Sequence, residues 1–134
     1  MFLYYYNTIY MNTKDPKLTA LQFNEFINRQ DIKGLNSLMT QDHTFIDRED
    51  EVTRGKDVMI KGWLEFFKSF PKYRNTFERV DSRDDLVILI GYAHWSKKEP
   101  HDPAIWTARI KNDRVAEWCI YKDTKKNRKK FKIK

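Results

Sequence analysis

The side chains with the clearest chemical potential are an aspartate and a histidine near the ends of two expected strands. Asp47 follows a short stretch of mixed polar and apolar residues, and His94 stands between Tyr92 and Trp95 in a longer one. Aspartate, histidine and tyrosine are residue types of general acid–base catalysis. A carboxylate facing an aromatic cavity could accept a proton near neutral pH. Asp47 and His94 are therefore candidates for acid–base chemistry, although a histidine at a strand end is also commonly structural.

The sequence indicates neither a metal nor a nucleotide cofactor. Its three histidines, at positions 43, 94 and 101, lack the spacing of a zinc site. Its four glycines are scattered at positions 34, 55, 62 and 91, so they form no glycine-rich phosphate loop. Cys119 is the only cysteine, which excludes an intrachain disulfide, and its apolar surroundings predict a buried, inert thiol. We expect no cofactor and no metal.

The net charge of +7 is concentrated at the C-terminus. From Lys122 onward the chain carries eight basic residues and one acidic residue, Asp123, which leaves 18 basic and 18 acidic residues in 1–121. We assign residues 124–134 to a basic tail. Such a run is usually solvated, although it could contact nucleic acid or anionic lipid. Because the remainder is neutral, we do not expect nucleic acid to be the main partner.

The length of 134 residues predicts one domain, which we place at residues 18–123. Residues 1–17 are expected to be an N-terminal arm, and translation could begin at Met11, where a polar lead-in starts. The arm lacks the basic start and cleavage site of a signal peptide. No stretch is apolar over the length of a membrane span. We therefore expect a cytoplasmic protein with no membrane partner.

Three helices are expected to support the candidate residues. Apolar residues recur at helical spacing over 18–27, again after Asp31, and from Gly55 to Phe70, where Pro71 stops the pattern. The third helix is the most aromatic. Its stripe includes Trp63 and Phe67, which either pack in the core or form the wall of a pocket.

Strand-like alternation of polar and apolar residues occurs once before the third helix and four times after it. A short strand is expected within 42–50, and four more over 73–82, 86–96, 104–111 and 114–122. A two-residue hairpin at 112–113 pairs Lys111 with Arg114. This register places Trp106, Glu117 and Tyr121 on one face and Trp118 on the other. It also places Arg109 and Glu117 on opposite faces of the hairpin.

Both faces of this predicted hairpin are largely apolar, although an antiparallel sheet with one solvated face would alternate apolar and polar residues. The helices can cover only one of the two faces. We therefore expect a second copy of the sheet to cover the other, in a homodimer that buries Trp118.

Several phrases resemble the SnoaL-like, nuclear transport factor 2-like superfamily. They are DHTFID at 42–47, RGKD at 54–57, FPKY at 70–73 and RVAEW at 114–118, followed by YKD at 121–123. The resemblance covers about 18–123. It implies an α+β fold of the cystatin-like type, in which a curved antiparallel sheet packs on three N-terminal helices around a conical pocket. This superfamily includes isomerases, cyclases, dehydratases, hydrolases and pure binding modules, so the fold leaves the function open.

Ketosteroid isomerase relatives provide a residue-level test of the resemblance. Their general base is matched by Asp47, but the positions of their tyrosine and protonated aspartate donors are occupied by Phe23 and Trp106. Steroid isomerisation is therefore not expected. The resemblance to dehydratase-like relatives is what makes His94 a partner for Asp47.

Three functions remain open at this point. The first is a binding module for a small apolar or aromatic molecule, the second an acid–base isomerase, dehydratase or cyclase with Asp47 as base, and the third an interaction protein that acts through its basic tail. The expected ligand-binding residues are aromatic or acidic: Trp63, Phe67, Tyr92, Trp106, Glu117 and Tyr121.

Overall fold

A six-stranded sheet forms the centre of the computed structural model, which describes residues 15–96, 98 and 101–134. The strand order is β2-β1-β6-β5-β4-β3, and every pair is antiparallel except β1 and β6, which run parallel. The elements follow one another as α1 Pro16–Asn28, α2 Ile32–Leu38, β1 Met39–Ile46, β2 Val52–Arg54, α3 Lys56–Ser69, β3 Arg74–Arg83, β4 Leu86–His94, β5 Asp102–Lys111, β6 Arg114–Lys122 and α4 Lys125–Lys130. The expected α+β architecture is confirmed.

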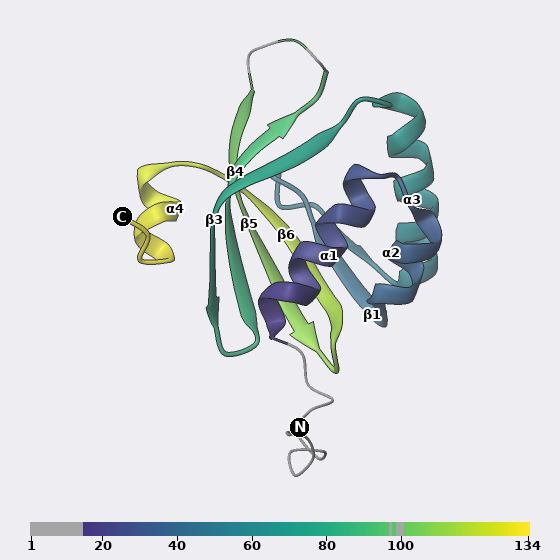
Figure 1. The fold of residues 1–134 in the computed structure, drawn as a ribbon, viewed down its shortest axis with the longest axis horizontal. Helices are drawn as coiled ribbons and strands as arrows, with labels where there is room; N and C mark the ends of the chain where they lie inside the picture. Colours follow the sequence, from purple (N-terminus) through teal and green to yellow (C-terminus); the bar gives the residue numbers. More distant parts are fainter. Residues whose placement is uncertain (1–14, 97, 99–100) are drawn as a thin grey trace, which may run out of the picture.

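The helices form two groups on opposite sides of the sheet. Figure 1 shows α1, α2 and α3 on one side and α4 on the other. We call the side that faces α1–α3 the inner face and the side that faces α4 the outer face. The inner face holds the larger hydrophobic core, so any internal site lies there.

α2 and α3 begin where the sequence predicts, and α1 begins two residues earlier than expected, at Pro16. Asp15 caps α1 by accepting the backbone N–H of Lys17 at 3.0 Å, and Asp31 caps α2 by accepting that of Gly34 at 2.9 Å. α3 begins after Gly55, whose φ of 101° is favoured only for glycine. It ends at Ser69, two residues before Pro71.

Two elements were missed by the sequence analysis. β2 has only three residues, too few for a visible alternation, and it pairs with the end of β1. α4 lies in the segment assigned to a basic tail, because its six residues are all polar and the apolar residues that bury against the sheet, Phe131 and Ile133, follow it. β1 also begins at Met39, earlier than the expected strand.

A β-bulge overturns the predicted register of the last hairpin. The turn pairs Lys111 with Arg114 as expected, but Arg109 pairs with Glu117, so Ala116 is an extra residue on β6. One inserted residue moves every later side chain to the opposite face. Glu117 therefore lies on the outer face beside Arg109, which corrects the prediction that these two residues are on opposite faces.

Trp118 consequently points into the inner core. It is fully buried within the single chain, pairs with Ala108, and its ring centroid lies 4.9 Å from that of Phe23. The prediction that Trp118 forms a dimer interface was therefore wrong. A homodimer as such stays a prediction.

Candidate functional site

A cavity of about 640 Å³ lies between α3 and the inner face of the sheet. Its deep part is apolar and its rim is polar. The apolar residues are Phe45, Val58, Met59, Trp63, Phe66, Ala93, Ala104, Trp106, Trp118 and Ile120, together with Gly62, and the remaining lining residues are Asp47, Arg48, Glu49, Thr53, Tyr73, Trp95 and Asp102. This size and composition are typical of a site for a small organic molecule.

Small residues on the sheet leave the space for this cavity. Ala93 of β4 and Ala104 of β5 lie on neighbouring strands of the inner face and line the cavity, and Gly91 pairs directly with Ala104. Larger side chains flank them, since Trp106 follows two residues along β5. The sheet is therefore hollowed where β4 and β5 meet.

The opposite wall comes from the aromatic stripe of α3. Trp63 is only 5 % exposed and packs edge-on against Phe45, with 5.9 Å between ring centroids. Phe67 stacks on Trp63 at 5.5 Å from behind and does not line the cavity. Phe67 was an expected ligand contact, and the structure makes it a support for Trp63 instead.

Two indole N–H groups in the cavity wall have no acceptor within the described part of the chain. They are Nε1 of Trp63 and Nε1 of Trp106, both inaccessible to solvent, and Trp106 is fully buried. A buried donor without an acceptor costs about 1–3 kcal/mol. Such donors are rare in native proteins. Because neither nitrogen is exposed to the cavity, a bound acceptor reaches them only when the side chains around them shift.

An ion pair crosses the rim of the cavity. Arg48, in the turn after β1, donates to both carboxylate oxygens of Asp102 at 2.9 Å, and Trp95 donates its indole N–H to the same carboxylate at 3.2 Å. Arg48 and Asp102 have side-chain exposures of 30 % and 28 %. This bidentate geometry fixes the β1–β2 turn to the start of β5.

Trp95 joins the rim to an aromatic cluster at the end of α3. Its ring lies 5.0 Å from Phe70, 5.8 Å from Phe66 and 4.8 Å from Tyr73. Tyr73 also lines the cavity, and burial raises the pKa of its phenol well above the usual value. Tyr73 therefore offers a neutral hydroxyl to the site.

Asp47 lines the cavity at the rim, but its carboxylate is partly occupied. Oδ1 accepts the backbone N–H groups of Glu49 and Glu51 at 2.8 and 3.0 Å, which fastens the β1–β2 turn. Oδ2 makes no hydrogen bond to any residue in the described ranges. Asp47 thus shares the cavity with Trp106, which was one of the expected ligand-binding residues.

His94 lies on the outer face, away from Asp47. Neighbouring Ala93 lines the cavity, so alternation along β4 turns His94 to the other side. Its imidazole is 6 % exposed, with Nε2 2.7 Å from Thr76 Oγ1 and Nδ1 2.6 Å from Nδ1 of His101. The predicted pairing of His94 with Asp47 is therefore wrong.

Three further expected contacts also lie outside the cavity. Tyr92 shares the outer side of β4 with His94, and the bulge in β6 turns Glu117 and Tyr121 outward. The residues that sequence reasoning missed are Arg48, Tyr73, Trp95 and Asp102. No local pattern joins Arg48 to Asp102, which are 54 positions apart. The small residues Ala93 and Ala104 within apolar strands were the available signal of a hollow.

The described residues include neither a metal-binding cluster nor a membrane-spanning helix. Among them, no group of three or more His, Cys, Asp and Glu side chains is arranged to hold a metal ion. Within the same ranges, no helix combines the length and the apolar character needed to cross a membrane.

Solved structures of similar fold cover nearly the whole domain. A cystatin fold protein from Novosphingobium aromaticivorans aligns with a TM-score of 0.73 at 15 % identity, over 82 % of this chain and 100 % of that chain. A candidate SnoaL-like polyketide cyclase from Shewanella putrefaciens aligns with a TM-score of 0.71 at 18 % identity, over 90 % of each chain. TerC, co-crystallised with polyporic acid, aligns with a TM-score of 0.69 at 15 % identity, over 86 % of this chain and 97 % of that one.

These likenesses are below 25 % identity and show the shared fold alone. No curated protein matches the chain in sequence. Residues 20–118 match the family described as SnoaL-like domain, and this match spans most of the chain. The protein therefore belongs to the SnoaL-like domain family.

Proposed function

We propose that the protein binds a small, largely aromatic molecule that carries a hydrogen-bond acceptor, in the cavity between α3 and the sheet. The observation that carries this proposal is the pair of unpartnered indole N–H groups of Trp63 and Trp106 in an otherwise apolar wall. Aromatic side chains would supply contact area, and the two donors would select an acceptor such as a carbonyl oxygen.

The surroundings of the two tryptophans support an acceptor over a cation or a second donor. The deep cavity contains no acidic side chain, because Asp47, Glu49 and Asp102 all belong to the polar rim. An acceptor in the deep part would remove the cost of the two unmade hydrogen bonds once the side chains that bury the two nitrogens shift to admit it. TerC, which has the same fold, was co-crystallised with polyporic acid. This precedent supports a small-molecule site and does not identify the ligand of this chain.

The cytoplasmic location stays a prediction.

A matched pair of probes tests the proposal. 9-Fluorenone and fluorene share the same three-ring frame, but only fluorenone has a carbonyl oxygen. We expect fluorenone to bind about tenfold more tightly by isothermal titration calorimetry, since one or two hydrogen bonds to buried donors contribute roughly 1–2 kcal/mol. Trp106→Phe keeps an aromatic ring but removes the N–H, so the advantage of fluorenone should fall to about threefold or less.

Trp95→Phe is the control for this measurement. Trp95 also lines the cavity, but its N–H already donates to Asp102 at the rim. The preference for fluorenone should therefore survive in Trp95→Phe. Equal binding of the two probes by the unmodified protein, or the same loss in both variants, would contradict an acceptor-selective site.

A second candidate function is general-base catalysis by Asp47, favoured by the location of its carboxylate at the cavity. The test is deuterium exchange at the α-carbon of 2-tetralone in D₂O, followed by NMR, because a base there removes a C–H proton and returns a deuteron. Asp47→Asn should lower the protein-dependent exchange rate by about 10²-fold or more while it retains an oxygen acceptor for the turn. An unchanged exchange rate, or no exchange above buffer, would leave binding as the function.

A further inference from the structure

The C-terminal segment, residues 124–134, is folded against the outer face of the sheet. Its two apolar side chains, Phe131 and Ile133, are each 8 % exposed and cluster with three isoleucines of that face, Ile88, Ile90 and Ile105. Figure 1 shows α4 and the chain terminus on this side of the sheet. The backbone that carries the basic side chains is therefore held in one place.

Arg128 fixes the shape of the segment and neutralises the acid beside it. Its guanidinium donates to both carboxylate oxygens of Asp123 at 2.6 and 2.9 Å, and to the backbone carbonyl of Lys134 at 3.0 Å. The Thr124 hydroxyl caps α4 by accepting the N–H of Asn127 at 3.1 Å. Because Asp123 is the only acidic residue in this part of the sequence, no unpaired acidic side chain stands among the lysines.

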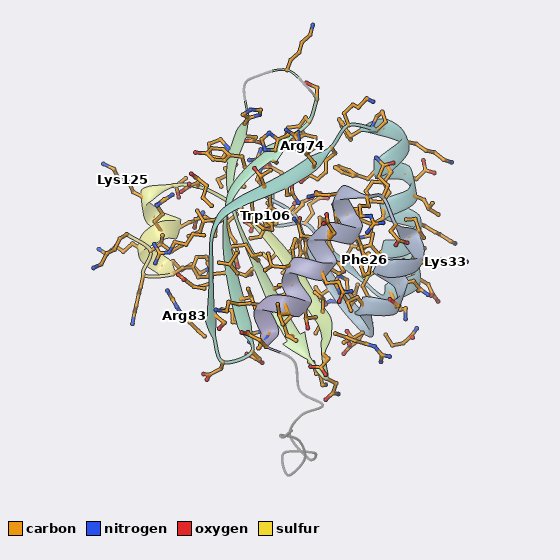
Figure 2. All side chains as sticks on the ribbon, in the orientation of Figure 1. Phe26, Lys33, Arg74, Arg83, Trp106 and Lys125 are labelled. Atoms are coloured by element: carbon orange, nitrogen blue, oxygen red, sulfur yellow. The ribbon has the colours of Figure 1, made fainter. Side chains whose placement is uncertain are left out.

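Six lysines project from the segment, and all six are exposed: Lys125, Lys126, Lys129, Lys130, Lys132 and Lys134. Within the described ranges none of them forms an ion pair. Figure 2 shows Lys125 pointing away from the sheet. Lys125 and Lys129 are four positions apart on α4, as are Lys126 and Lys130, and like charges at this spacing destabilise a helix. A bound anion would remove this repulsion.

Basic side chains surround an open hollow of about 560 Å³ on the segment. Its lining consists of Arg128, Ile133 and four of the lysines, which are Lys125, Lys129, Lys132 and Lys134. None of the described residues that line it is acidic. An ammonium group is a compact charge with three donors and suits phosphate oxygens. The hollow therefore fits an anion that brings several phosphate groups to one place.

Three features favour the backbone of a nucleic-acid double helix as that anion. Phe131 and Ile133 face the sheet, so the segment has no apolar side chain to insert into a bilayer and no exposed ring on which unpaired bases could stack. Arg128 is already engaged, so it cannot read base edges. Lys126 and Lys130 lie outside the hollow and extend the basic surface beyond what a small anion would contact.

We propose that residues 124–134 bind the phosphate backbone of double-stranded nucleic acid without sequence preference, with the four lysines of the hollow as the main contacts. Residues 1–121 are neutral in sum and add no general attraction. The binding is therefore electrostatic and strongly dependent on salt. It does not depend on what the inner cavity binds.

The test measures fluorescence anisotropy of a fluorescein-labelled DNA duplex of about 20 base pairs, titrated with the full chain. We expect a Kd of about 10 μM or tighter at 50 mM salt. Four neutralised phosphates give a slope of about −3.6 in log affinity against log salt, so affinity should fall about tenfold at 100 mM salt. A duplex of shuffled sequence should bind within about twofold. No binding at 50 mM salt, or a slope near zero, would overturn the proposal.

A pair of fourfold variants locates the binding surface. The first replaces the lysines of the hollow, as Lys125→Gln, Lys129→Gln, Lys132→Gln and Lys134→Gln. The control replaces four exposed lysines outside the segment, as Lys33→Gln, Lys61→Gln, Lys68→Gln and Lys72→Gln. Both lower the net charge by four. Affinity for the duplex should fall at least tenfold in the first and stay within about threefold in the control, whereas equal losses would show that net charge alone is responsible.

Two further probes distinguish the double helix from other polyanions. Affinity for a single strand of the same length, and for vesicles of phosphatidylcholine with phosphatidylserine, should be lower than for the duplex. Tighter binding of either probe than of the duplex would refute the assignment to a double helix. If the fourfold variant of the hollow does not melt cooperatively, Lys129→Gln with Lys132→Gln decides, with a loss of at least fivefold supporting the proposal and unchanged affinity overturning it.

Discussion

Trp118→Arg is expected to abolish folding. Trp118 is fully buried, packs on Phe23 and lines the cavity. Removing a large aromatic side chain from a core costs about 3–5 kcal/mol, and an unpaired buried charge adds several more. The sum is comparable to the whole stability of a domain, which is about 5–15 kcal/mol. We expect no cooperative thermal transition by circular dichroism.

Leu64→Arg is the control for this substitution. Leu64 lies on α3 and is 42 % exposed, so an arginine there keeps its charge in water. We expect its free energy of unfolding to stay within about 0.5 kcal/mol of the unmodified value. A folded, monomeric Trp118→Arg variant of a protein that is otherwise dimeric would instead place Trp118 at an interface and refute the bulged register.

Gly91→Ala is the second change with a large expected effect. An added Cβ would overlap the backbone carbonyl oxygen of Thr76 and lie 2.8 Å from the Cα of Phe77. These are backbone atoms of β3, next to the bulge between Phe77 and Arg79, so the clash cannot be relieved by a side-chain rotation. We expect the free energy of unfolding to fall by about 3 kcal/mol or more, measured by urea denaturation.

The same change should disturb the site. Phe77 pairs with Gly91 and its ring lies 5.0 Å from that of Trp106, so a shift of β3 is transmitted to the cavity wall. Gly62→Ala is the matched control, because nothing lies within 4 Å of its added Cβ on α3. It should stabilise the helix by up to about 1 kcal/mol. Tolerance of alanine at both positions would show that β3 and β4 are not as closely apposed as the structure has them.

Local patterns account for what the sequence predicted well. Helical spacing, the helix start after Asp31 and Pro71 after α3 are each read within a few neighbouring residues. The hairpin at 112–113 was equally local, and its first pairs are those predicted. The bulge at Ala116 could not be anticipated, because it replaces one plausible register with another of similar local energy, and the packing of Trp118 on Phe23 favours the second.

The candidate site divides in the same way. Asp47, Trp63 and Trp106 line the cavity. Each was placed by one local pattern, which is a strand end for Asp47, a helical stripe for Trp63 and a regular strand for Trp106. Glu117 and Tyr121 were misplaced by the bulge, and His94 by the alternation along β4 that puts Ala93 inside. Arg48, Tyr73, Trp95 and Asp102 were absent from the prediction, because their association is made only by folding.

The sequence by itself determined the α+β class, the three N-terminal helices and the presence of two apolar sheet faces, because these follow from short-range periodicity. Only the tertiary structure decided which aromatic side chains face the cavity, and that the outer face is covered by Phe131 and Ile133. The reason is physical. A basic run has little local preference, and its two apolar residues acquire a place only when an apolar sheet surface already exists for them to bury.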